Sequence, residues 1–182
     1  PSWENDDKED DFVKALASMK VNLLIKQAVW PEAYASVILD IEKQRKMHEG
    51  QYDNLHFIEP EESILVALAM SDMVVSDESS VMTEALMYGV PSLAITDWLI
   101  PDSNPKRFAS VPMDYVFKKK KVEMREYVEK ILEGNQYKHQ MEHWWDENFS
   151  NVGNSSSDIM DCVEYYALDG KKDDFKKLRL AS

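Results

Sequence analysis

Hydrophobic residues follow two different spacings along this chain. Short apolar runs are typical of strands buried on both faces, and they predict strands over 21–26, 54–58, 72–76, 91–96 and, more briefly, 114–117. Between them, apolar residues recur every three to four positions, which is typical of a helix with one buried face. This spacing predicts helices over 7–19, 32–47, 60–70, 80–88, 122–132, 136–148 and 157–168.

Proline and glycine mark the boundaries of the predicted helices. Pro31 and Pro60 stand where two helices begin, and Gly50 and Gly89 stand where two end. Strands that alternate with helices imply a parallel sheet covered on both faces. The fold class is therefore expected to be α/β, a Rossmann-like doubly wound parallel sheet. One domain is expected over 1–168, followed by a charged tail over 169–182.

Composition places the chain among soluble globular proteins. Apolar residues make up 44% of the 182 residues and charged residues 30%. No run approaches the roughly 20 apolar residues of a membrane span, and the acidic start differs from a signal peptide, so a cytoplasmic location is expected. The single cysteine, Cys162, excludes an internal disulfide and a metal site built from several cysteines.

The formal net charge of −13 disfavours nucleic acid as a partner, because it repels phosphate backbones. The one basic run is Lys118-Lys119-Lys120-Lys121. We interpret it as the solvated start of a helix, and binding of nucleic acid or anionic lipid is the alternative. Any association with a membrane is expected to be peripheral.

The segment 71–91 carries the most chemistry, because it predicts a strand, a polar turn and a helix. In an open parallel sheet the ligand crevice lies at the carboxyl ends of the strands, and a helix N-terminus there attracts phosphate. Asp77, Ser79 and Ser80 lie in this turn, and Glu84 follows Ser80 by one helical turn. The serines could bind a diphosphate and Glu84 could accept ribose hydroxyls. Alternatively, the first three residues only cap the helix and Glu84 is an exposed surface residue.

The same segment resembles a known family. The turn Asp77-Glu78-Ser79-Ser80 is similar to the Asp-x-Ser-Ser turn of the CDP-glycerol glycerophosphotransferases. Glu84-Ala85 and Gly89-Val90-Pro91 resemble the Glu-Ala and Gly-x-Pro elements of many GT-B nucleotide-sugar enzymes. More loosely, Pro1-Ser2-Trp3 and the segment 149–156 resemble the two ends of that family's second domain.

The resemblance implies the C-terminal half of a GT-B fold that binds a nucleotide-diphosphate donor, such as CDP-glycerol. Asp77, Ser79 and Ser80 would lie near the diphosphate and Glu84 near the ribose or base. The alternatives are a glycosyltransferase or epimerase domain that uses a UDP-sugar, and a non-catalytic nucleotide-binding or interaction domain. No metal or other cofactor is required.

Two departures from the family pattern leave catalysis open. The family places a histidine after the strand that ends here at Lys26, whereas this chain continues with Gln27. The resemblance also implies an N-terminal acceptor domain and a first strand before Pro1, so the chain is expected to be a fragment. A strand missing from a sheet leaves unpaired backbone groups unless another segment fills the place.

A few further side chains are candidates for contacts with ligands. Lys106 and Arg107 lie in a long proline-bearing loop and could reach a phosphate. His139 and His143 are four residues apart on a predicted helix, near Glu142 and Asp146, which could hold a metal. We favour instead an interpretation in which His143-Trp144-Trp145 packs this helix against the sheet or a missing domain. His56 is expected to be structural.

Overall fold

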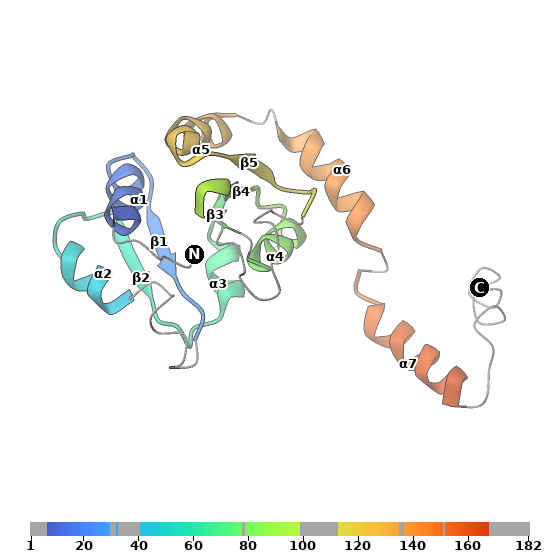
Figure 1. The fold of residues 1–182 in the computed structure, drawn as a ribbon. Helices are drawn as coiled ribbons and strands as arrows, with labels where there is room; N and C mark the ends of the chain where they lie inside the picture. The colour runs from blue at the N-terminus through green and yellow to red at the C-terminus, as the bar shows by residue number, and fades with distance from the viewer. Residues whose placement is uncertain are drawn as a thin grey trace, which may run out of the picture. The chain divides into compact units, whose positions relative to one another are not determined.

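The computed structural model describes residues 7–29, 32, 41–77, 79–98, 113–134, 137–150 and 152–167. The chain divides into two compact units, Pro1–Trp145 and Asp146–Ser182, where the sequence suggested one unit to residue 168. The tail expected over 169–182 lies outside the described residues. The first unit contains all the strands of the described residues, and the second contains the helix α7, Ser155–Ala167 (Figure 1).

In the described part of the chain, five short strands form two parallel sheets. Strand β1, Leu23–Lys26, pairs with β2, Leu55–Ile58. The second sheet has the order β3-β4-β5, with bounds Val74–Ser76, Ser92–Ile95 and Phe117–Lys119. Every strand pair is parallel. The protein therefore has a mixed α/β fold that is compatible with a Rossmann-like architecture.

Helices separate the strands along the chain, as the hydrophobic pattern predicts. They are α1 Asp7–Ala17, α2 Ile41–His48, α3 Ile64–Ala69, α4 Val81–Met87, α5 Met124–Glu133 and α6 Lys138–Asn148, with short 3₁₀ turns at η2 Thr96–Trp98 and η3 Lys121–Glu123. The predicted helix end at Gly89 is confirmed, because this glycine has a φ of 68°. Helix α3 begins later than predicted, since Ser63 rather than Pro60 is its N-cap and accepts the backbone N–H of Leu65.

Apolar side chains pack on both faces of the strands. On one face, residues of α1, α2 and α5 form a single cluster with strand residues of both sheets, including Ile25 and Leu93. We call this the first core. On the other face, α3 and α4 pack around Leu68, Met82 and Ala94 in two smaller clusters, which we call the second core. All four residues of β4 are buried, so the prediction of strands covered on both faces is confirmed there.

Strand β5 begins three residues later than the sequence predicts and ends two residues later. The apolar residues Tyr115 and Val116 belong to the preceding segment and pack toward α4 in the second core. The strand itself includes Lys119, whose ammonium lies 4.8 Å from the centre of the Tyr127 ring and 3.4 Å from Glu123 Oε1. These contacts allow a lysine to occupy a half-buried strand position, where the sequence predicted the solvated start of a helix.

The sequence predicts a single sheet, but the described strands form two, and the break lies between β1 and β3. Among the described residues, β1 pairs only with β2, and β3 pairs only with β4. Ile25 of β1 and Val75 of β3 nevertheless pack against the same first core. The two sheets therefore share a core without sharing a hydrogen-bond ladder.

Candidate donor site at the carboxyl end of β3

Asp77 follows β3 directly and is buried rather than exposed to solvent. Its relative exposure is 9%, and that of Ser76 is 8%. Ser76 Oγ donates a hydrogen bond of 3.3 Å to Asp77 Oδ1. The carboxylate is therefore held against the end of the strand, where it can fix the turn that leads into α4.

The two serines of the turn have different environments. Ser79 is half-buried, and its Oγ accepts a long hydrogen bond of 3.4 Å from the backbone N–H of Val81. Ser80 is the N-cap residue of α4, but it is exposed and its side chain caps no backbone group. Only Ser79 thus provides a side-chain cap, and the Ser80 hydroxyl remains available to a ligand.

Glu84 lies one helical turn after Ser80, as the spacing predicts. Its backbone N–H donates to the Ser80 carbonyl over 3.4 Å, which places both residues on one side of the helix. The carboxylate is half-buried, and within the described part of the chain it makes no hydrogen bond or ion pair. Glu84 is therefore not the exposed surface residue that the alternative interpretation of this segment expects.

Packing holds α4 firmly beneath these polar groups. Met82, Ala85 and Leu86 are almost completely inaccessible. Thr83 Oγ1 lies 2.6 Å from the hydroxyl of Tyr115, in the segment that leads into β5. Sequence spacing did not indicate this bond, because the two residues are 32 positions apart. The helix that carries Ser80 and Glu84 is thus fixed by contacts on its buried side.

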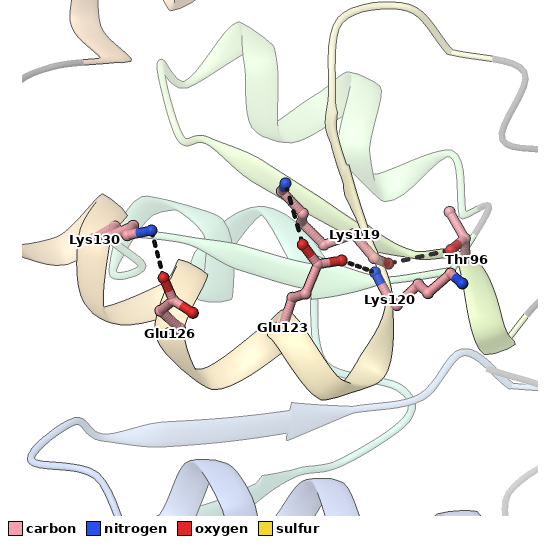
Figure 2. A network of polar contacts seen from close by, with 6 residues as sticks. All are labelled: Thr96, Lys119, Lys120, Glu123, Glu126 and Lys130. Atoms are coloured by element: carbon pink, nitrogen blue, oxygen red, sulfur yellow. Dashed lines mark hydrogen bonds and ion pairs between the residues drawn. The ribbon is translucent and has the colours of Figure 1, made fainter.

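At the carboxyl ends of β4 and β5, by contrast, the polar groups bind one another (Figure 2). Thr96 Oγ1 donates to the carbonyl oxygen of Lys119 over 3.3 Å, and Asp97 accepts the backbone N–H of Lys121 at 2.8 Å. Glu123 accepts the backbone N–H of Lys120 at 3.2 Å, and this hydrogen bond is the main reason why the pKa of its carboxyl group is lowered. The interpretation of the lysine run as the start of a helix therefore holds for Lys120 and Lys121, which lead into η3, whereas Lys118 and Lys119 belong to β5.

An aromatic cluster joins β5 to the two helices that follow it. Phe117 contacts Tyr137 at 4.7 Å and Trp144 at 4.9 Å between ring centres. The contact with Trp144 confirms that this part of the aromatic segment packs α6 against the sheet. Burial of Tyr127, followed by its hydrogen bond with Tyr137, raises the pKa of Tyr127 to about 12.

The remaining candidates do not form a second site in the described residues. His139 is 97% exposed at its side chain and pairs with Glu142, and no group of three or more histidine, cysteine, aspartate or glutamate residues described here could hold a metal. His56 is exposed on β2. Glu78, Lys106, Arg107 and the segment 1–3 lie outside the described residues.

The comparisons with known proteins identify no relative. No protein-family model, curated protein or solved structure matches the chain significantly. None of the helices described is both long and apolar enough to cross a lipid bilayer.

Proposed function

We propose that this chain is the donor-binding domain of a transferase similar to the CDP-glycerol glycerophosphotransferases, and that it corresponds to the C-terminal half of a GT-B fold. One observation carries the proposal. At the carboxyl end of β3, the Ser80 hydroxyl and the Glu84 carboxylate lie on the same side of α4 and have no partner among the described residues.

The position of this turn in the fold supports a ligand site. Ile41 of α2 packs in the first core, whereas Met82 and Ala85 of α4 pack in the second. Parallel crossovers are right-handed, so the face on which the connecting helix lies decides on which side the next strand is added. Because α2 and α4 lie on opposite faces, β2 is added to β1 in one direction along the sheet and β4 is added to β3 in the other. Ligands of open α/β sheets bind at the carboxyl ends of the strands where this reversal occurs. The turn 77–80 follows one of those two strands.

The chemistry of the turn suits a nucleotide diphosphate. In a chain of net charge −13, a dianionic group needs local donors. The hydroxyls of Ser79 and Ser80 would supply them, and Glu84 would accept hydroxyls of the ribose. The domain would contribute positioning and stabilisation of the leaving diphosphate, while an acceptor domain elsewhere in the protein would supply the acceptor.

A non-catalytic nucleotide-binding domain is the second candidate, and one observation favours it. The residues after β1 are Gln27, Ala28 and Val29, none of which is a general acid or base. The ammonium of Lys26, at the end of β1, donates to the carbonyl oxygens of Glu59 and Pro60, each at 3.0 Å. It is thus engaged in joining β1 to the end of β2.

Calorimetric titration tests the proposal with CDP-glycerol, CDP, a UDP-sugar and inorganic phosphate as separate ligands. CDP-glycerol is expected to bind most tightly, and Ser80→Ala and Glu84→Gln are each expected to weaken binding at least tenfold. Ser157→Ala on α7 is the matched control, because this serine is exposed and lies in the other unit.

Each other outcome has a distinct meaning. Preference for the UDP-sugar would assign a glycosyltransferase or epimerase domain of the same fold. Binding of CDP-glycerol without turnover by the full-length protein would favour the non-catalytic candidate. A well-folded chain that binds none of these ligands would contradict the donor site.

A further inference from the structure

Helix α3 is apolar on every side, although only one side of it is buried. The stretch 64–70 contains no polar residue. Ala67 and Leu68 are buried, and Leu68 packs in the second core. The opposite side of the helix is exposed and consists of Leu65, Val66, Ala69 and Met70. Because a helix that is apolar all round is normally covered all round, the outer side of α3 indicates a surface that a partner covers.

The end of α4 extends this apolar surface. Met87 and Tyr88 are exposed, and Tyr88 follows Ala85, which packs beside α3 in the second core, by three positions. Helices α3 and α4 contact each other (Figure 1). They also end at the same side of the sheet, because they lead into β3 and β4, where the Val74 N–H donates to the Pro91 carbonyl at 2.9 Å. The exposed residues of the two helices therefore belong to one surface.

We call this surface the α3–α4 patch, and its large residues are Leu65, Val66, Met70, Met87 and Tyr88. The relative exposure of each lies between 45% and 64%. The exposed side of α5, in the same unit, instead carries the ion pairs Arg125–Glu129 and Lys130–Glu126. Soluble proteins rarely expose a contiguous group of large apolar side chains unless it is an interaction site.

The segment that forms the patch carries acidic residues only. Between His56 and Lys106 the sequence contains no lysine, arginine or histidine. Glu61 and Glu62 come just before α3, Asp72 comes just after it, and all three are exposed. Among the described residues, none of these three carboxylates has an ion-pair partner. The border of the patch is therefore complementary to lysine and arginine side chains.

We propose that the α3–α4 patch binds an amphipathic helix of a partner protein, whose apolar side is flanked by lysine or arginine. Two neighbouring helices offer ridges and grooves in which the side chains of a third helix can pack. Met70 and Met87 have flexible side chains that adapt to an irregular partner. Tyrosine, here Tyr88, is enriched at protein interfaces.

Charge favours this partner over two others. In a two-fold symmetric dimer the patch of one copy faces the same patch of the other, so the carboxylates of Glu61, Glu62 and Asp72 would approach their counterparts. The net charge of −13 adds to this repulsion. An anionic lipid surface would be repelled for the same reason. The inference does not depend on the proposed nucleotide site, because Ser80 lies at the opposite end of α4 from Met87.

Fluorescence anisotropy on the whole 182-residue chain tests the inference. The labelled probe peptide consists of two repeats of Leu-Lys-Lys-Leu-Leu-Lys-Leu, which place the leucines on one side of a helix. A peptide with glutamate in place of every lysine is the acidic control. A peptide of strictly alternating leucine and lysine is basic but has no apolar helix side. The probe is expected to bind at least tenfold more tightly than either control at physiological ionic strength.

Substitutions on both helices locate the binding surface. The double variant Val66→Gln/Met87→Gln is expected to weaken binding of the probe at least tenfold, because it removes apolar surface from α3 and α4. Its melting temperature should stay close to that of the wild-type protein, since both side chains are exposed. Val122→Gln is the matched control, because Val122 is 88% exposed in the same unit but lies outside the patch. It should leave binding unchanged.

The acidic border is tested with Glu61→Gln/Glu62→Gln, which should weaken binding of the probe, whereas Glu133→Gln on α5 should not. Equal binding by the wild-type protein and the double variant Val66→Gln/Met87→Gln would overturn the inference, as would a folded chain that does not bind the probe. A dimer in analytical ultracentrifugation that the same double variant dissociates would overturn it in favour of a second copy. Tighter binding to phosphatidylserine vesicles than to the probe would overturn it in favour of a lipid surface.

Discussion

The hydroxyl groups of Thr83 and Tyr115 lie 2.6 Å apart and join α4 to the segment that leads into β5. This hydrogen bond is partly buried and links elements that are distant in the sequence. It fixes the helix whose outer side carries Ser80 and Glu84. Its loss should therefore affect both the stability of the domain and the order of the candidate site.

Replacement of Tyr115 by phenylalanine tests this bond. Tyr115→Phe is expected to lower the free energy of unfolding by about 1 kcal/mol, the usual net contribution of one hydrogen bond. Urea denaturation measures the change, and a double-mutant cycle with Thr83→Val should give a coupling of similar size. Tyr88→Phe is the control, because Tyr88 is exposed at the end of α4. Additive effects of the two substitutions would contradict the bond.

Asn54 stabilises the turn between α1 and β1. Its Nδ2 atom lies within hydrogen-bonding distance of three backbone carbonyls, those of Ala17, Met19 and Val21, at 2.9, 3.2 and 2.7 Å. Asn54→Ala is expected to destabilise the fold by about 1–3 kcal/mol, because partly buried carbonyls lose their donor. The nearby Asn22→Ala is the control, since Asn22 is exposed, and it should change the urea midpoint little.

Glu123 is expected to give the domain part of its sensitivity to acid. Its hydrogen bond from the Lys120 N–H, aided by Lys119, lowers the pKa of this carboxyl group below the usual 4.5. A lowered pKa stabilises the fold above pH 4.5, and this contribution is lost as the pH falls through the lowered value. Glu123→Gln should therefore lower stability at pH 7 and flatten the loss of stability in acid. Denaturant midpoints between pH 7 and 2.5 measure both effects.

The matched control for this prediction is Glu133→Gln at the exposed end of α5. It should leave the stability at pH 7 close to that of the wild-type protein. An acid profile of Glu123→Gln that runs parallel to the wild-type profile would mean that the carboxylate does not contribute in this way.

Tyr127 should make the stability of the fold depend on pH in the alkaline range. Burial raises the pKa of its hydroxyl from 10.0 to about 12 in the folded protein. The unfolded chain then loses this proton first, so stability is complete below pH 10 and decreases as the pH rises toward 12. Tyr127→Phe is expected to reduce that decrease. Absorbance titration of the phenolate should show one tyrosine fewer in the late-titrating group.

The sequence by itself determined the order and kind of most elements. Hydrophobic spacing located helices at 81–87 and 124–133 and the buried strand at 92–95 to within two residues, because burial on one or both faces leaves a periodic pattern. Gly89 marked a helix end because its positive φ suits a residue without a Cβ. The turn 77–80 was identified from its residue types and its place after a strand.

Only the tertiary structure decided which side chains already have a hydrogen-bond or ion-pair partner. It buried Asp77 against Ser76, paired Thr83 with Tyr115, and bound the lysine run to Asp97, Asp114 and Glu123. It also divided the strands into two sheets around one core. The Thr83–Tyr115 and Asp97–Lys121 bonds join residues 32 and 24 positions apart, and the division into sheets depends on which strands lie side by side. A local pattern of residue types contains neither kind of information.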